Sequence, residues 1–144
     1  GEVIGIISLK IVQDEVEGMG FAIPIEDALD YAGKIEKGET IQRPYVGISM
    51  VDATETYALW QYRITLPENV NDGVVIIEVV KDSPAEKAKL QKGDVITKLN
   101  DKSISSLAEF RYELYKYEVG DKINVTYIRN NKETTTSITL GKNK

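Results

Sequence analysis

Residues 75–104 read VIIEVVKDSPAEKAKLQKGDVITKLNDKSI, and this order of signals restricts the fold more than any other part of the chain. Two apolar runs, each typical of a buried strand, enclose the signal of a short helix. That signal consists of Ser83 as N-cap, a proline at the first helical position and Glu86, which completes a capping box. It predicts a helix over residues 84–90. Gly93 and Asp94 then form a corner that turns the chain into the second strand.

Similar signals continue on both sides of this stretch. The sequence DATE at residues 52–55 resembles a capping box and predicts a helical turn in the ETYALWQY segment, while SLAE at 106–109 opens a helix that runs to about residue 117. The pair Asn130-Asn131 predicts a tight hairpin turn before a Thr-rich final strand. Residues 45–140 are therefore predicted to form a compact α+β domain, a partly open β-barrel of five or six short strands with two helices.

The N-terminal part has a different pattern. Residues 3–9 and 19–25 are apolar and strand-like. A helix with apolar residues at helical spacing follows from residue 28 and stops at Gly38. The polar stretch after it ends in a proline and is typical of a linker, which places a domain boundary near residue 43.

Composition excludes several classes of chemistry. The 144 residues include no histidine and no cysteine, which rules out a His-based catalytic triad, a thiol nucleophile, a disulfide and a Cys/His zinc site within the chain. The formal net charge of −5 at pH 7 argues against nucleic acid as a partner. No apolar run is long enough to cross a membrane, and the N-terminal run lacks the features of a targeting segment. We expect no cofactor and no bound metal.

Three other groups of residues carry weak signals. The GMG at residues 18–20 is half of a dinucleotide fingerprint, but it precedes a strand instead of opening a helix. The carboxylates within residues 14–17 are more typical of a solvated loop than of a metal site. Trp60 with Tyr57 and Tyr62 is more typical of a core or a surface patch than of a ligand cage.

The strongest candidate binding site is the tetrapeptide at residues 45–48, YVGI, which places Gly47 in an apolar turn directly before a strand. A glycine there lets successive backbone N–H groups converge on an anion. The strand that follows can accept an extended peptide at a free edge by β-augmentation. Such a turn is also common as a purely structural element, and the pattern alone leaves both interpretations open.

Together these segments resemble a PDZ domain of the kind found in HtrA/Deg-type bacterial trypsin-like serine proteases. The resemblance covers residues 44–140 and rests on PYVGISM, on DSPAEKAKLQKGDVI, on the helix that begins at residue 107 and on VGDKINVTYIRNN. The N-terminal GEVIGI and EGMGFAIPIEDALDYAGKIEKG resemble the last two strands of the HtrA protease domain and the helix that follows them. The chain would then begin just after the catalytic serine, and it is expected to be inactive alone because the family's catalytic His, Asp and Ser are missing.

The fold implied by this resemblance is α+β, with a PDZ-like partly open β-barrel of five to six strands and two helices. Two strands and a linker helix left over from a trypsin-like β-barrel precede it. The corresponding boundaries are 1–27 for the strands of a truncated protease domain, 28–43 for the linker helix and linker, 44–141 for the PDZ domain and 142–144 for the tail.

The family's peptide-binding pattern can be carried over position by position. Phe110 is expected in the core, because it points away from the groove face of its helix. Lys89 stands where the family usually has a glycine, a residue that often takes a positive φ, so the turn is expected to be either mildly strained or differently shaped. The implied binding residues are Tyr45, Val46, Gly47 and Ile48 in the carboxylate-binding loop, Ile48, Ser49 and Met50 in the strand that pairs with the ligand, and Leu107, Arg111 and Leu114 on the groove face of the second helix.

The resemblance implies a peptide-binding module that captures C-terminal or unfolded protein segments and recruits substrate to a serine endoprotease or regulates it, in protein quality control. Expected partners are such segments, the remainder of its own protease domain and further copies, since the parent family forms trimers. The parent protein is expected to be extracytoplasmic and anchored at the bacterial cell surface. The alternative is a structural role in which residues 3–9 and 19–25 mediate self-association.

Overall fold

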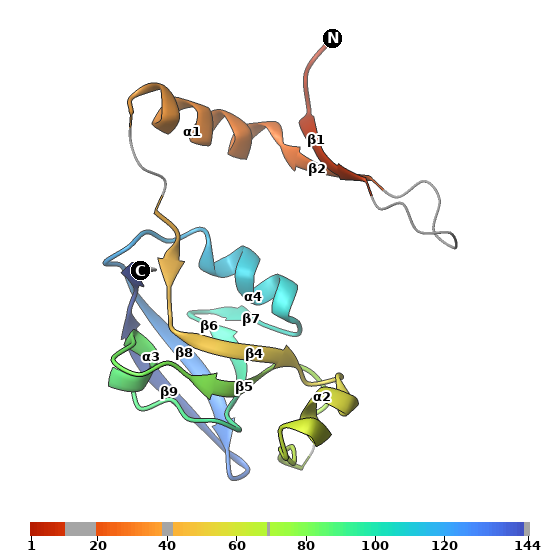
Figure 1. The fold of residues 1–144 in the computed structure, drawn as a ribbon, viewed down its shortest axis with the longest axis vertical. Coiled ribbons are helices and arrows are strands. Elements are labelled where there is room, and N and C mark those ends of the chain that lie inside the picture. Colours follow the sequence, from red (N-terminus) through yellow and green to blue (C-terminus); the bar gives the residue numbers. More distant parts are fainter. Residues whose placement is uncertain (11–19, 39–41, 69, 143–144) are drawn as a thin grey trace. The chain divides into compact units, whose positions relative to one another are not determined.

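The structure is a computed structural model that describes residues 1–10, 20–38, 42–68 and 70–142 (Figure 1). The chain divides into two compact units, Gly1–Ile41 and Gln42–Lys144. Within the described ranges, no helix has both the length and the apolar character needed to cross a membrane. The acidic loop predicted at residues 14–17 lies outside these ranges, so its prediction stays open.

The first unit pairs two antiparallel strands, β1 (Gly5–Lys10) and β2 (Gly20–Pro24), which lead into helix α1 (Ile25–Glu36). The helix begins before the predicted residue 28, because Pro24 is its N-cap and ends the strand. Gly38 has a φ of +72° and donates its N–H to a carbonyl of the last turn, which confirms it as the stop signal. The origin of these strands in a trypsin-like barrel stays a prediction.

The second unit is built on an antiparallel sheet ordered β4-β5-β6-β8-β9, with the short β7 paired to β6 and a separate pair formed by β3 and β10. This is the α+β arrangement that the sequence predicts. The strands are β3 (Pro44–Tyr45), β4 (Ile48–Asp52), β5 (Val74–Val79), β6 (Val95–Leu99), β7 (Lys102–Ser103), β8 (Lys122–Arg129), β9 (Lys132–Thr139) and β10 (Gly141–Lys142). The helices of its described part are α2 (Thr56–Gln61), α3 (Pro84–Lys87) and α4 (Leu107–Leu114), and α2 is the helical turn predicted in the ETYALWQY segment.

Most local signals act as expected. Ser83 is the N-cap of α3, and its hydroxyl accepts a hydrogen bond from the Glu86 N–H at 3.2 Å. The helix is shorter than predicted because Lys89 adopts a φ of +62° and closes it in a Schellman motif, with Leu90 N–H donating to Ala85 at 3.0 Å. Lys89 thus adopts the positive φ that the family's glycine often has, so the structure shows the first of the two expected outcomes. Asn130 and Asn131, with φ of +50° and +60°, form the expected hairpin turn.

The predicted capping box at residues 52–55 is wrong. Asp52 is the last residue of β4, whereas α2 begins only at Thr56, with Glu55 as an N-cap that makes no side-chain capping bond. The Asp52 carboxylate accepts a hydrogen bond from the backbone N–H of Leu107 instead. A local motif was therefore overridden by a contact between segments far apart in the sequence.

The sheet packs a hydrophobic cluster on each face. Val74 and Ile76 of β5 belong to the large cluster that includes Phe110 of α4, so Phe110 lies in the core as predicted. Val75, between them, belongs to a smaller cluster with Leu59 of α2. Because side chains alternate along a strand, α4 and α2 lie on opposite faces of the sheet.

Candidate functional site

Strand β4 lies at one end of the main sheet and pairs with β5 alone among the described strands. The ladder joins Ile48 to Val79 and Val51 to Val75, with a register shift after Ser49. The other edge of β4 therefore offers backbone N–H and C=O groups in the arrangement that accepts an added strand. Helix α4 packs beside the same strand (Figure 1).

The loop before β4 is fixed by its glycine. Gly47 has a φ of +84°, and a Cβ at this position would overlap the Cβ of Ser83 and lie 2.8 Å from its hydroxyl oxygen. The carbonyl of Val46 accepts a hydrogen bond from Ala85 N–H, and that of Gly47 accepts one from Val80 N–H, both at 2.9 Å. Neither bond uses an N–H group of the loop. The backbone is thus held in the left-handed region by contacts behind it.

Apolar side chains of β4 and α4 meet at the large core cluster. Ile48, Met50 and Leu107 are half-buried and pack against the large core cluster, which also contains Leu114, 6% exposed. The structure thus brings together four of the predicted groove residues. Arg111, one helical turn after Leu107, is exposed at the rim.

The remaining predicted residues support the loop and the strand. Val46 is buried in the large core cluster, and the half-buried Tyr45 pairs with Gly141 in the short β3–β10 ladder. Ser49 stands opposite Glu78 and, by alternation, faces away from the side where Ile48 and Met50 lie. Ser49 can therefore contribute its backbone to a ligand while its side chain lies on the sheet face opposite Ile48 and Met50.

The N-terminus of α4 is held by two carboxylates. Ser106 caps the helix by accepting the Glu109 N–H at 3.3 Å, and Glu109 accepts bonds from the hydroxyl and N–H of Ser105 at 2.7 and 2.8 Å. These bonds from Ser105 hold the pKa of Glu109 below its ordinary value. Asp52 accepts the Leu107 N–H and so joins the end of β4 to the start of α4. The sequence carries no signal that separates this use of Asp52 from a capping box.

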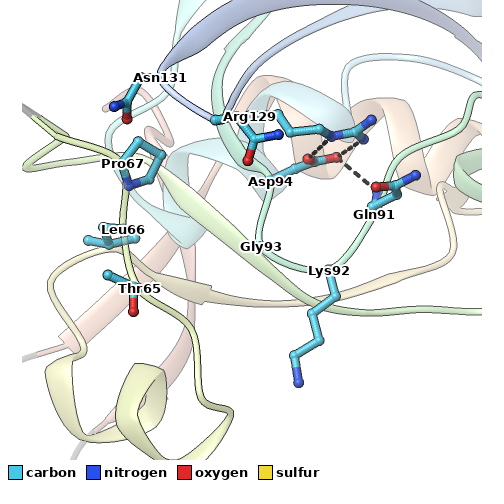
Figure 2. A pocket seen from close by; sticks show the side chains of 10 residues that line it. Thr65, Leu66, Pro67, Gln91, Lys92, Gly93, Asp94, Arg129 and Asn131 are labelled. Atoms are coloured by element: carbon cyan, nitrogen blue, oxygen red, sulfur yellow. Dashed lines mark hydrogen bonds and ion pairs between the residues drawn. The ribbon is translucent and has the colours of Figure 1, made fainter.

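A hollow of about 370 Å³ lies elsewhere on the second unit, and none of the predicted binding residues lines it (Figure 2). Its wall contains the Gly93-Asp94 corner, whose carboxylate is 1% exposed. The guanidinium of Arg129 donates two hydrogen bonds of 2.6 Å to that carboxylate, and Gln91 N–H donates to it at 2.8 Å. The hydrogen bond to Asp94 raises the pKa of Arg129. This pair stabilises the corner and was not found from the sequence.

The described residues contain no group of three or more His, Cys, Asp or Glu side chains that could hold a metal ion. Tyr57 and Trp60 of α2 are exposed, so they form a surface patch and not a core. Their ring centroids are 6.1 Å apart. Tyr62 is less exposed, and Lys92 lies over its ring.

Comparison with known proteins gives consistent results. The PDZ domain family matches residues 44–140. The serine protease Do-like HtrA of Lactococcus lactis subsp. lactis (strain IL1403) is 39% identical over 147 residues, which cover 99% of this chain and 36% of the relative. The protein of the same description from Bacillus subtilis (strain 168) is 41% identical over 143 residues, covering 97% of this chain and 32% of the relative. The chain thus spans about a third of the length of these curated relatives.

Solved structures show the same relationship. An HtrA-type protease, AlgW, solved with a decapeptide, superposes with a TM-score of 0.76 at 25% identity, covering all of this chain and 43% of its own. A serine endoprotease from Yersinia pestis gives a TM-score of 0.65 at 28% identity, covering all of this chain and 44% of its own.

Proposed function

Because this chain belongs to the PDZ domain family and its relatives are HtrA-type serine proteases, we propose that it is the peptide-binding module of such a protease. The observation that carries the proposal is the open edge of β4, with the Gly47 loop at one end and the apolar wall of α4 beside it. The resemblance to HtrA-type proteases and the PDZ-like fold expected from the sequence are both confirmed.

In the proposed complex, a peptide lies antiparallel to β4 and places its terminal carboxylate at the N–H groups of residues 46–48. Its last side chain, which is apolar, enters the space lined by Ile48, Met50 and Leu114. Arg111 is placed to contact an acidic side chain upstream, for an exposed pair worth about 0.5 kcal/mol. Binding would deliver unfolded segments to the protease domain or bias its active state, at an extracytoplasmic site on the cell surface. The AlgW structures solved with a decapeptide and with a tripeptide support peptide binding in this class of protein.

The test is a titration of the chain with a peptide ending in valine and with the same peptide as its C-terminal amide. We expect the free acid to bind at least about tenfold more tightly, because the amide loses the charge-assisted bonds to the loop. Equal affinity of the two forms would contradict the carboxylate site. A substitution at Gly47 is a poor test, since the overlap with Ser83 would disturb the fold together with the site.

A second candidate function is association through the first unit. Its described residues expose several large apolar side chains, among them Ile4 at 85% and Ile7 at 81%. Such surface is costly in water, so the remainder of the protease domain or a second copy would cover it. Light scattering tests this function: we expect the chain to self-associate in a concentration-dependent way, and a strictly monomeric chain at high concentration would refute it.

A further inference from the structure

We infer that α2 adds a second contact to the groove: the exposed rings of Tyr57 and Trp60 accept a lysine or arginine side chain of the bound peptide, upstream of its C-terminus. The inference rests on the proposed function, because it needs a peptide held along β4. It extends that function by assigning a chemical preference to a part of the ligand that lies beyond β4.

The position of α2 brings it within reach of a peptide that lies along β4. Figure 1 shows the helix beyond the C-terminal end of β4, at the opposite end of the strand from the Gly47 loop. Leu59 of α2 and Val51 of β4 pack in the small cluster, on the sheet face opposite α4. A peptide antiparallel to β4, with its carboxylate at Gly47, therefore runs upstream toward α2.

The register of the peptide determines which of its side chains face α2. Side chains of an extended strand alternate between the two faces of a sheet. If the last side chain enters the apolar groove on the α4 face, then the second, fourth and sixth from the end lie on the α2 face. Strand β4 has only five residues, about 17 Å, so the sixth residue passes its end at Asp52 and reaches α2.

The rings of Tyr57 and Trp60 are exposed and suited to bind a cation. Tyr57 is 73% exposed and Trp60 74%, and their planes are inclined by 33°. Several other rings of this chain are already covered by a cation; these pairs are Arg43 with Tyr115, Lys92 with Tyr62, Lys116 with Tyr112 and Arg129 with Tyr127. Among the described residues no lysine or arginine lies over Tyr57 or Trp60. Tryptophan is the strongest cation–π acceptor, so the best ring in the chain is open to a ligand cation.

Charge supports a basic ligand. Glu55, the N-cap of α2, is exposed, and so is Glu78, which stands opposite Ser49 in the ladder. The net charge of the chain is −5. A basic side chain at the sixth residue is therefore attracted to the α2 end of β4, whereas the acidic side chain proposed to contact Arg111 lies on the α4 face of the sheet.

The test compares two peptides that end in a free-acid valine and differ only at the sixth residue from the end, arginine in one and citrulline in the other. Citrulline keeps the shape of arginine but is uncharged. Affinities are measured by fluorescence anisotropy for the wild type, for Trp60→Leu and for Tyr62→Leu. Tyr62 is the matched control, because its ring is already covered by Lys92. Trp60 is the only tryptophan, so the quenching of its emission reports contact in the wild type directly.

We expect the arginine peptide to bind the wild type about two- to fivefold more tightly than the citrulline peptide. The ratio should fall to about one in Trp60→Leu and persist in Tyr62→Leu. A ratio that is unchanged in Trp60→Leu would overturn the inference. If Trp60→Leu instead converts a dimer to a monomer and leaves the ratio unchanged, the rings bind a second copy of the chain and the inference is also overturned.

The amide form of the arginine peptide distinguishes a failure of the proposed groove from a failure of the contact with α2. If acid is preferred over amide but arginine is not preferred over citrulline, the groove stands and the contact with α2 is refuted. If acid and amide bind equally, the proposed groove fails and the contact with α2 fails with it.

Discussion

Replacing Arg129 by alanine should destabilise the second unit strongly, although the residue is not part of the proposed groove. Its guanidinium bonds Asp94 twice, Nε to Oδ1 and Nη2 to Oδ2, each at 2.6 Å, and also donates to the carbonyl of Lys89 at 2.9 Å. Asp94 is 1% exposed. In Arg129→Ala the buried carboxylate keeps, of its bonds to described residues, the one from Gln91 N–H.

The magnitude follows from the difference in burial of the partners. Breaking a buried pair by removing one member costs about 3–5 kcal/mol. The Arg129 side chain is 30% exposed, so water can partly replace it, and we expect the lower end, about 3 kcal/mol. Asp94→Asn should cost less, about 1–2 kcal/mol, since the amide oxygen still accepts a bond and the guanidinium left behind can be hydrated.

The assay is urea unfolding at neutral pH, followed by far-UV circular dichroism. The control is Lys98→Ala, which removes the exposed pair with Glu133 at 3.8 Å and should cost at most about 0.5 kcal/mol. If Arg129→Ala costs no more than Lys98→Ala, then the ion pair does not stabilise the corner. A larger loss in Asp94→Asn than in Arg129→Ala would contradict the argument from burial.

Three further predictions concern the groove. In urea unfolding, Gly47→Ala should lower the free energy of unfolding by about 2 kcal/mol more than Gly120→Ala. Both positions have a positive φ, but of the two only at Gly47 would the new Cβ overlap a neighbour. Asp52→Ala should lower the free energy of unfolding by about 1–2 kcal/mol and weaken binding of the valine peptide, because the N–H of Leu107 loses its acceptor, and Asp52→Asn should have a smaller effect. Unchanged stability and affinity in Asp52→Ala would show that this bond does not join β4 to α4. Hydrogen bonds keep the pKa of Glu109 low, so the stabilisation by its carboxylate is present at neutral pH and is lost as the pH falls through that lowered pKa. Glu109→Gln should therefore be less stable than the wild type at pH 7. The difference between their urea midpoints should shrink below about pH 4.

The sequence predicted those elements whose signals are local. The cap at Ser83 and the hairpin turn at residues 130–131 depend on neighbours within a few positions, and both are confirmed. The binding residues were placed by the resemblance, and the structure brings Ile48 and Leu114 into one cluster. Their role in binding stays a prediction.

The features that the sequence missed depend on contacts between distant segments. Asp52 and Leu107 are 55 positions apart, and Asp94 and Arg129 are 35 apart. A carboxylate followed by suitable residues has the same local pattern whether it caps its own helix or reaches across the fold. The wrong capping box at residues 52–55 is the consequence, because only the tertiary fold determines which N–H the Asp52 carboxylate meets.

The segment at residues 75–104 also determines the shape of the binding loop, although none of its side chains is assigned to the ligand. Ser83 blocks any side chain at position 47, and Ala85 N–H holds the carbonyl of Val46. Lys89, which closes α3, is bonded through its carbonyl to Arg129, and Arg129 in turn grips Asp94 at the corner. A chain of direct contacts thus leads from the ion pair through α3 to the loop. Loss of Arg129 should consequently loosen the Gly47 loop and weaken carboxylate binding even at temperatures where the domain is still folded, and an unchanged affinity in folded Arg129→Ala would show that α3 holds the loop independently of the corner.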